Sequence, residues 1–117
     1  MAITINTRPG EPASDLRHVD FRITNHGTGP AFLPACAGRP FYVVERPDPP
    51  DWIAAQGSFN LCIAILPMGA IRLEAGQSLA ETTVVPVGPA YRLRLGFAAS
   101  EGGSPDDTVV SGTFAVR

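Results

Sequence analysis

Two cysteines, Cys36 and Cys62, carry the most reactive side chains of this 117-residue chain. They are too few and too far apart in sequence to make a zinc site by themselves. A disulfide between them would stabilise the fold by about 3.5 kcal/mol through loop closure. The alternative is two buried thiols that pack as small apolar groups. We expect the disulfide, which would place the protein in the periplasm or on the cell surface, whereas unpaired thiols would favour the cytoplasm.

The other residues that could do chemistry form no recognisable catalytic or metal-binding pattern. His18 and His26 lack the close, regular spacing of metal-ligating histidines. Asp48 and Asp51 do not follow the alternating pattern of a calcium loop, so we expect them in a turn. Ser78 leads into an expected strand, whereas a nucleophile elbow requires a turn from strand to helix. We therefore expect a protein that is not an enzyme and that needs neither cofactor nor metal.

Composition and charge limit the class of protein further. The net charge is −2, the isoelectric point is about 5.5 and no basic cluster exists, which argues against nucleic-acid binding. All nine basic residues are arginine, a usage typical of GC-rich bacterial genomes. The longest apolar run, 61–71, is too short for a transmembrane span and contains Pro67 and Gly69. We expect that the given sequence contains no signal peptide, because Met1 leads directly into a strand-like segment. The protein would then be cytoplasmic, or the sequence would begin at a mature terminus.

Alternation of apolar and polar residues recurs along the whole chain and predicts an all-β fold. The segment 91–97 alternates large apolar residues with Arg92 and Arg94, as in a strand with one dry face and one wet face. Seven or eight such strands in one domain, 1–117, are typical of an antiparallel sandwich or a small barrel. The expected strands are 2–6, 17–24, 31–33, 41–46, 71–74, 79–85, 91–98 and 109–116. The proline-rich segment 47–52 is expected to be a surface excursion, with Trp52 folded back onto the core.

Three short motifs resemble those of bacterial immunoglobulin-like β-sandwich domains. They are a strand that ends in an Asn turn (21–27), a Leu-x-x-Gly-x-Ser turn (73–78) and a segment like a tyrosine corner around Tyr91. The resemblance implies an immunoglobulin-like sandwich of seven or eight strands, and the two turns are also similar to those of intracellular proteinase inhibitors. The chain departs from antibody-type domains at Leu93, which stands where their second cysteine would be.

An uncharged segment, 59–71, gives the best indication of function. It is either a strand buried on both faces or a partly exposed apolar surface that binds a protein partner. For the second case the predicted contact residues are Trp52, Phe59, Ile63, Ile65, Leu66 and Met68, with Arg39 and Arg46 as polar anchors.

Three functions are compatible with these observations. The leading prediction is an accessory subunit that docks onto a larger bacterial envelope or membrane-protein assembly. The alternative is a proteinase inhibitor that presents the proline-rich loop 46–52, since proline lowers the entropy lost on binding. Carbohydrate binding ranks last, because Trp52 with Tyr42 is the sole aromatic platform that the sequence offers.

Overall fold

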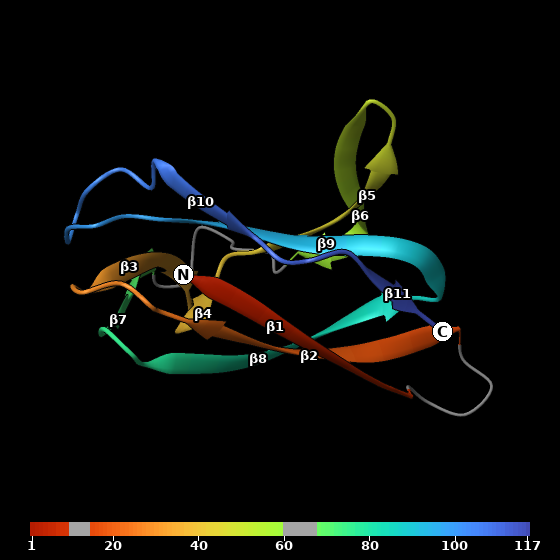
Figure 1. Cartoon of the computed structure of the whole chain (residues 1–117), viewed down its shortest axis with the longest axis horizontal. Coiled ribbons are helices and arrows are strands. Elements are labelled where there is room, and N and C mark those ends of the chain that lie inside the picture. The colour runs from red at the N-terminus through yellow and green to blue at the C-terminus, as the bar shows by residue number, and fades with distance from the viewer. Residues whose placement is uncertain (10–14, 60–67) are drawn as a thin grey trace.

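Antiparallel β-strands make up all of the regular secondary structure in the described part of the chain. The computed structural model describes residues 1–9, 15–59 and 68–117 (Figure 1). The strands are β1 (Ala2–Pro9), β2 (Leu16–Thr24), β3 (Ala31–Cys36), β4 (Arg39–Pro40), β5 (Val43–Asp48), β6 (Asp51–Phe59), β7 (Met68–Leu73), β8 (Ser78–Pro86), β9 (Gly88–Phe97), β10 (Asp107–Val110) and β11 (Phe114–Val116). None of the described residues forms a helix that could cross a membrane.

The first sheet joins β1, β2 and β8 in that order and has the expected alternation. Val19, Phe21 and Ile23 of β2 are buried, and the residues between them are more exposed. The register pairs Phe21 with Ile5 of β1 and with Glu81 of β8. The period-two pattern of β2 therefore points its apolar residues to one side of this sheet, as predicted.

The second sheet has the order β10-β9-β5-β6, and β11 also pairs with β9. Along β9, Tyr91, Leu93 and Leu95 are buried, whereas Arg92 and Arg94 project from the opposite face. A smaller sheet, β4-β3-β7, adjoins β9 through a bridge between Phe32 and Ala98.

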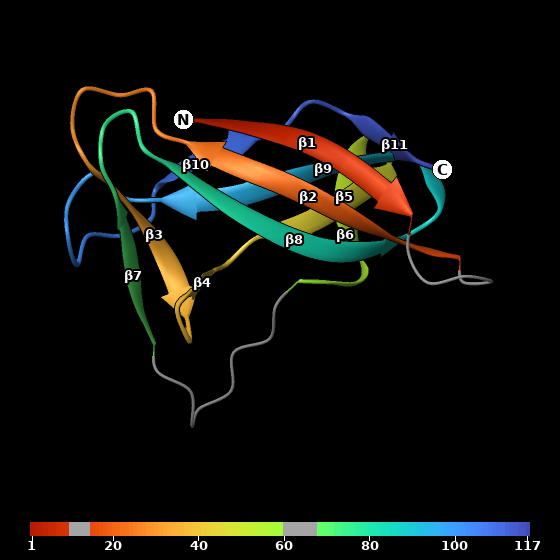
Figure 2. The same cartoon turned by 90° about the horizontal axis from the view of Figure 1, so that it is seen from below.

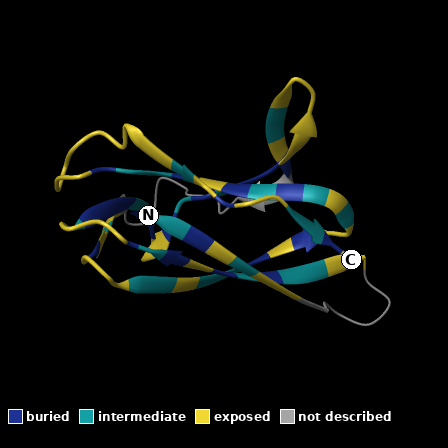
Figure 3. Ribbon diagram, viewed as in Figure 1, coloured by how far each residue is buried: buried dark blue, intermediate teal, exposed yellow. Residues whose placement is uncertain are grey.

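The core lies between the first sheet and β9 with its neighbours. In Figures 1 and 2 the strands β1, β2 and β8 form one layer, and β5, β9 and β10 lie across from them. Figure 3 shows that the strands of both layers contain buried residues. The rings of Phe21 and Tyr42 meet edge to face across this space, with 5.1 Å between their centroids. The arrangement is compatible with a β-sandwich.

The three turn motifs have specific hydrogen bonds. Asn25 is 4 % exposed, and its amide donates to the carbonyl oxygens of Gly29 and Leu73, both at 2.9 Å. Gly76 has a φ of 79°, a conformation that glycine adopts without steric cost. The Tyr91 hydroxyl donates to the Pro86 carbonyl at 2.9 Å, which confirms the hydrogen bond expected of a tyrosine corner.

The strand count and some boundaries differ from the predictions. The described residues contain eleven strands, instead of seven or eight, because β4 and β6 were not predicted and the last predicted strand is divided. The division falls at Ser111, whose hydroxyl accepts a hydrogen bond from the Leu93 amide at 2.8 Å and so replaces a regular ladder bond. The segment 47–52 is an excursion at the surface, as predicted, and it takes the form of the hairpin tip between β5 and β6.

Candidate functional site

The hairpin of β5 and β6 extends beyond the sheet to which it belongs. β5 pairs with β9 through Val43, Val44 and Glu45, and the β6 partners of β5 run from Val43 to the hairpin tip. From Arg46 onward the pairing with β6 continues without β9. Figure 1 shows the hairpin rising away from β9. Residues 46–51, which include the tip, are all exposed. The prolines of the tip donate no ladder hydrogen bonds, and such residues are tolerated where a strand has left the sheet interior.

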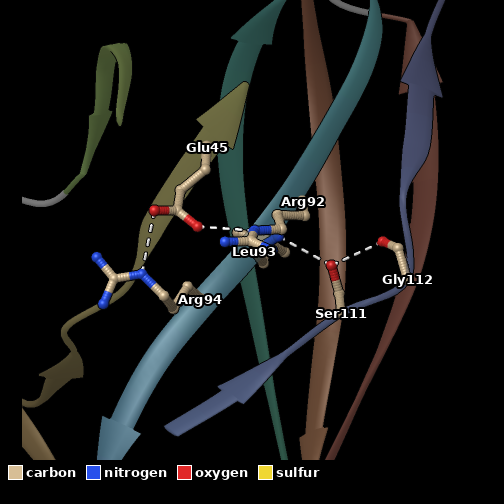
Figure 4. Close-up of polar contacts among 6 residues, drawn as sticks. All are labelled: Glu45, Arg92, Leu93, Arg94, Ser111 and Gly112. Carbon is tan, nitrogen blue, oxygen red and sulfur yellow. Dashed lines mark hydrogen bonds and ion pairs between the residues drawn. The ribbon is translucent and has the colours of Figure 1, made fainter. Parts of the chain in front are cut away.

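Glu45 anchors the base of this hairpin to β9. Its side chain lies on the outer face of the sheet, although the residue is 6 % exposed. One carboxylate oxygen accepts a hydrogen bond from Arg92 Nε at 2.8 Å, and the other accepts one from Arg94 Nε at 3.1 Å (Figure 4). Two charge-assisted hydrogen bonds therefore hold β5 against β9 where the hairpin leaves the sheet.

Trp52 supplies a second contact between the hairpin and β9. The Arg92 guanidinium carbon lies 4.4 Å from the centroid of the Trp52 ring, a distance typical of a cation–π contact. Because Arg92 also binds Glu45, one arginine connects both strands of the hairpin to β9. The prediction that Trp52 folds back onto the core is wrong, since its partner is on the outer face of the sheet.

The structure separates the two predicted polar anchors. Arg46 lies on the exposed part of the hairpin. Arg39 lies on β4 and donates a hydrogen bond to Glu81 of β8 at 2.7 Å. This hydrogen bond and the charge of Glu81 raise the pKa of Arg39 above its ordinary value. Arg39 thus connects two sheets, whereas Arg46 is available on the surface.

Several predicted contact residues fall outside the described part of the chain. Ile63, Ile65 and Leu66 belong to this group, as does Cys62. The structure describes the backbone positions of Phe59, which ends β6, and of Met68, which begins β7. The two interpretations of the segment 59–71 therefore both stay predictions.

Glu45, Arg92 and Arg94 were not predicted to act together. The sequence did place both arginines on the wet face of one strand. Glu45 directly follows the apolar residues 41–44 in the sequence, and an acidic residue next to an apolar run indicates a charged partner on a neighbouring strand. The identity of that partner depends on the pairing of β5 with β9, which local sequence does not specify.

The aromatic platform of Trp52 and Tyr42 does not exist. Tyr42 is 5 % exposed and packs against Phe21 in the core, whereas Trp52 lies on the hairpin against Arg92. The two rings belong to opposite faces of the sheet, and the prediction of a carbohydrate site there is wrong.

The chemically reactive residues are dispersed across the described ranges. Within 1–9, 15–59 and 68–117, no three His, Cys, Asp or Glu side chains converge on a point that could hold a metal ion. His26 is exposed in a turn, and Ser78 shares a hydrogen bond of 2.8 Å with the Thr24 hydroxyl. Cys36 ends β3 and is 4 % exposed.

No protein-family model matches the sequence, and no curated protein is significantly similar to it.

Proposed function

We propose that this chain is a non-catalytic interaction module that binds a protein partner through the hairpin of β5 and β6. The observation that carries the proposal is an exposed hairpin tip whose base is fixed by Glu45, Arg92 and Trp52. A projecting segment that is already ordered loses little conformational entropy when it binds, which favours affinity. Arg46 and the prolines of the tip provide a charged donor and a stiff apolar surface, both common at interfaces.

We further infer an immunoglobulin-like β-sandwich. Two layers of antiparallel strands and the hydrogen bond from Tyr91 to Pro86 support this assignment. Leu93 is fully buried where antibody-type domains have a cysteine, so this position is filled by ordinary apolar packing. The fold alone implies no particular function, because such domains serve many purposes.

A disulfide between Cys36 and Cys62 is part of the same proposal. Cys36 lies opposite Met68 in the pairing of β3 with β7, and Cys62 precedes Met68 by a few residues. A short segment can therefore bring the two residues within the separation that a disulfide requires. Mass analysis of the unreduced protein tests the bond: a deficit of two hydrogens is expected, and a full complement would contradict it.

The proposed setting is an extrinsic accessory subunit of a bacterial envelope or membrane-protein assembly, in the periplasm or on the cell surface. The proposed disulfide favours such a compartment, because disulfides form and persist in oxidising surroundings. The composition, rich in arginine and without lysine, supports a bacterial source.

The function is tested with a charge reversal at the hairpin tip. The wild-type protein is used to purify and identify the partner from the native source, and the affinity of the purified pair is then measured. Asp48→Arg is expected to weaken binding by at least about tenfold, since an interfacial charge reversal costs more than 1.4 kcal/mol. The matched control is Asp106→Arg, which makes the same change at an exposed position in the loop before β10. Equal affinities of the two variants would contradict the proposal.

A proteinase inhibitor is the second candidate. The exposed tip and its prolines at 47, 49 and 50 support this alternative, because inhibitory loops are rigid and project from their scaffold. The test is incubation of the pure protein with serine, cysteine, aspartic and metalloproteases. Slowed substrate turnover at about micromolar protein would favour inhibition, and unchanged turnover by all four classes would exclude it.

A further inference from the structure

An open hollow lies on the outer face of the first sheet, away from the hairpin. Its volume is about 540 Å³, within the range of sites that bind small molecules. Residues of β1, β2 and β8 line it: Thr4, Ile5, Asn6, Asp20, Phe21, Arg22, Ala80, Glu81 and Thr82.

The register of the sheet arranges the outward-facing residues of the hollow in two rows. One row runs across the strands from Thr4 through Arg22 to Ala80. The neighbouring row consists of Asn6, Asp20 and Thr82. The short side chain of Ala80 leaves space beside the long side chain of Arg22. Phe21 contributes no aromatic wall, because its ring packs against Tyr42 in the core.

The hollow crosses the whole sheet. β2 is the central strand, and β1 and β8 are its two neighbours in this sheet. Three strands at the usual spacing span about 10 Å. This width accommodates two linked pyranose rings lying across the strands.

The chemistry of the lining favours a neutral ligand with many hydroxyl groups. Thr4, Asn6 and Thr82 offer groups that both donate and accept hydrogen bonds. Asp20 accepts a hydrogen bond from the Thr82 hydroxyl, which orients the carboxylate. The charges of Asp20 and Arg22 balance, and Glu81 is paired with Arg39, so neither a polyanion nor a cation is favoured.

We propose that this hollow binds a neutral saccharide chain, with about two sugar residues in contact with the protein. Asp20 and Asn6 accept hydrogen bonds from sugar hydroxyls, and Arg22 donates to the hydroxyl and ring oxygens. Because no aromatic ring stacks on the sugar, binding depends on hydrogen bonds that compete with water, and the dissociation constant is about 1 mM. This site is independent of the protein-binding hairpin.

To test this, the full chain is titrated with four neutral trisaccharides. Binding is monitored through the amide chemical shifts in NMR spectra. The probes are maltotriose, cellotriose, laminaritriose and N,N′,N″-triacetylchitotriose. At least one is expected to shift amides within 4–6, 20–22 and 80–82. Arg22→Ala is expected to weaken that binding by about tenfold, the effect of losing a hydrogen bond from a charged group.

The control is Arg46→Ala, which removes an arginine that is also exposed but lies on the hairpin. It is expected to bind the trisaccharide as the wild type does. The NMR spectrum of each variant without added sugar verifies that the variant is folded. The proposal is overturned if no probe at about ten times the expected dissociation constant shifts these amides. It is equally overturned if Arg22→Ala binds like the wild type.

Discussion

Replacing Glu45 with glutamine removes the charge that holds the hairpin to β9 while keeping the size of the side chain. Arg92 and Arg94 then lose their common carboxylate, and the amide nitrogen of glutamine would face one of the two arginine donors. We therefore expect Glu45→Gln to destabilise the protein.

The magnitude of this loss follows from the exposure of the three side chains. Removing one partner of a fully buried ion pair costs about 3–5 kcal/mol, and an exposed pair contributes about 0–1 kcal/mol. The Glu45 side chain is 8 % exposed, whereas those of Arg92 and Arg94 are 26 % and 44 % exposed and remain partly hydrated. An intermediate loss of about 2 kcal/mol is expected, which lowers Tm by about 8 °C in a domain of this size.

Urea unfolding followed by circular dichroism measures the change in free energy. The matched control is Glu74→Gln, because Glu74 pairs with Arg72 where both side chains are 56 % exposed. The control is expected to have the same midpoint urea concentration for unfolding as the wild type. If Glu45→Gln were no less stable than Glu74→Gln, the carboxylate would not anchor the hairpin.

Three further changes are expected to have measurable effects in the same unfolding assay. Tyr91→Phe removes the hydrogen bond to Pro86 and is expected to cost about 1 kcal/mol; a wild-type unfolding curve would contradict this. Asn25→Ala leaves the buried carbonyl of Leu73 without its donor and also removes the hydrogen bond to the exposed Gly29, which is expected to cost about 2 kcal/mol. Asn6→Ala at an exposed position is expected to be nearly neutral. Trp52→Ala removes the cation–π contact with Arg92 and is expected to cost about 1 kcal/mol. It is also expected to speed amide hydrogen exchange in the hairpin more than in β2. An equal change of the exchange rates in both places would refute this.

The sequence predicted those strands that alternate clearly between apolar and polar residues. Over 19–23 in β2 and 91–97 in β9 every second side chain is large and apolar, so the period alone identifies the strand and its buried face. The tyrosine corner was also predictable, because the hydroxyl of Tyr91 reaches a carbonyl only five residues upstream.

Strand β6 could not be predicted in this way. Its residues Ala54, Ala55 and Gly57 have low strand propensity, and the prolines before them indicated a loop. The strand forms because it pairs with β5, and tertiary pairing overrides a weak local preference.

The anchor of the hairpin depends on long-range pairing in the same way. Arg92 and Arg94 were recognisable as outward-facing residues of one strand. Their common partner, Glu45, lies far away in the chain and is brought to them by the register of β5 with β9. Period and composition predict which face a side chain occupies, but they do not predict which residue lies opposite.

Site-specific photo-crosslinking tests the proposed protein-binding role of the hairpin most directly. A photoreactive amino acid is placed at position 48 of the hairpin tip or, as a control, at the exposed position 108 of β10. Irradiation of the complex with the purified partner is predicted to join the two proteins from position 48 and not from position 108. A crosslink from position 108 alone would locate the interface on another surface and contradict the account.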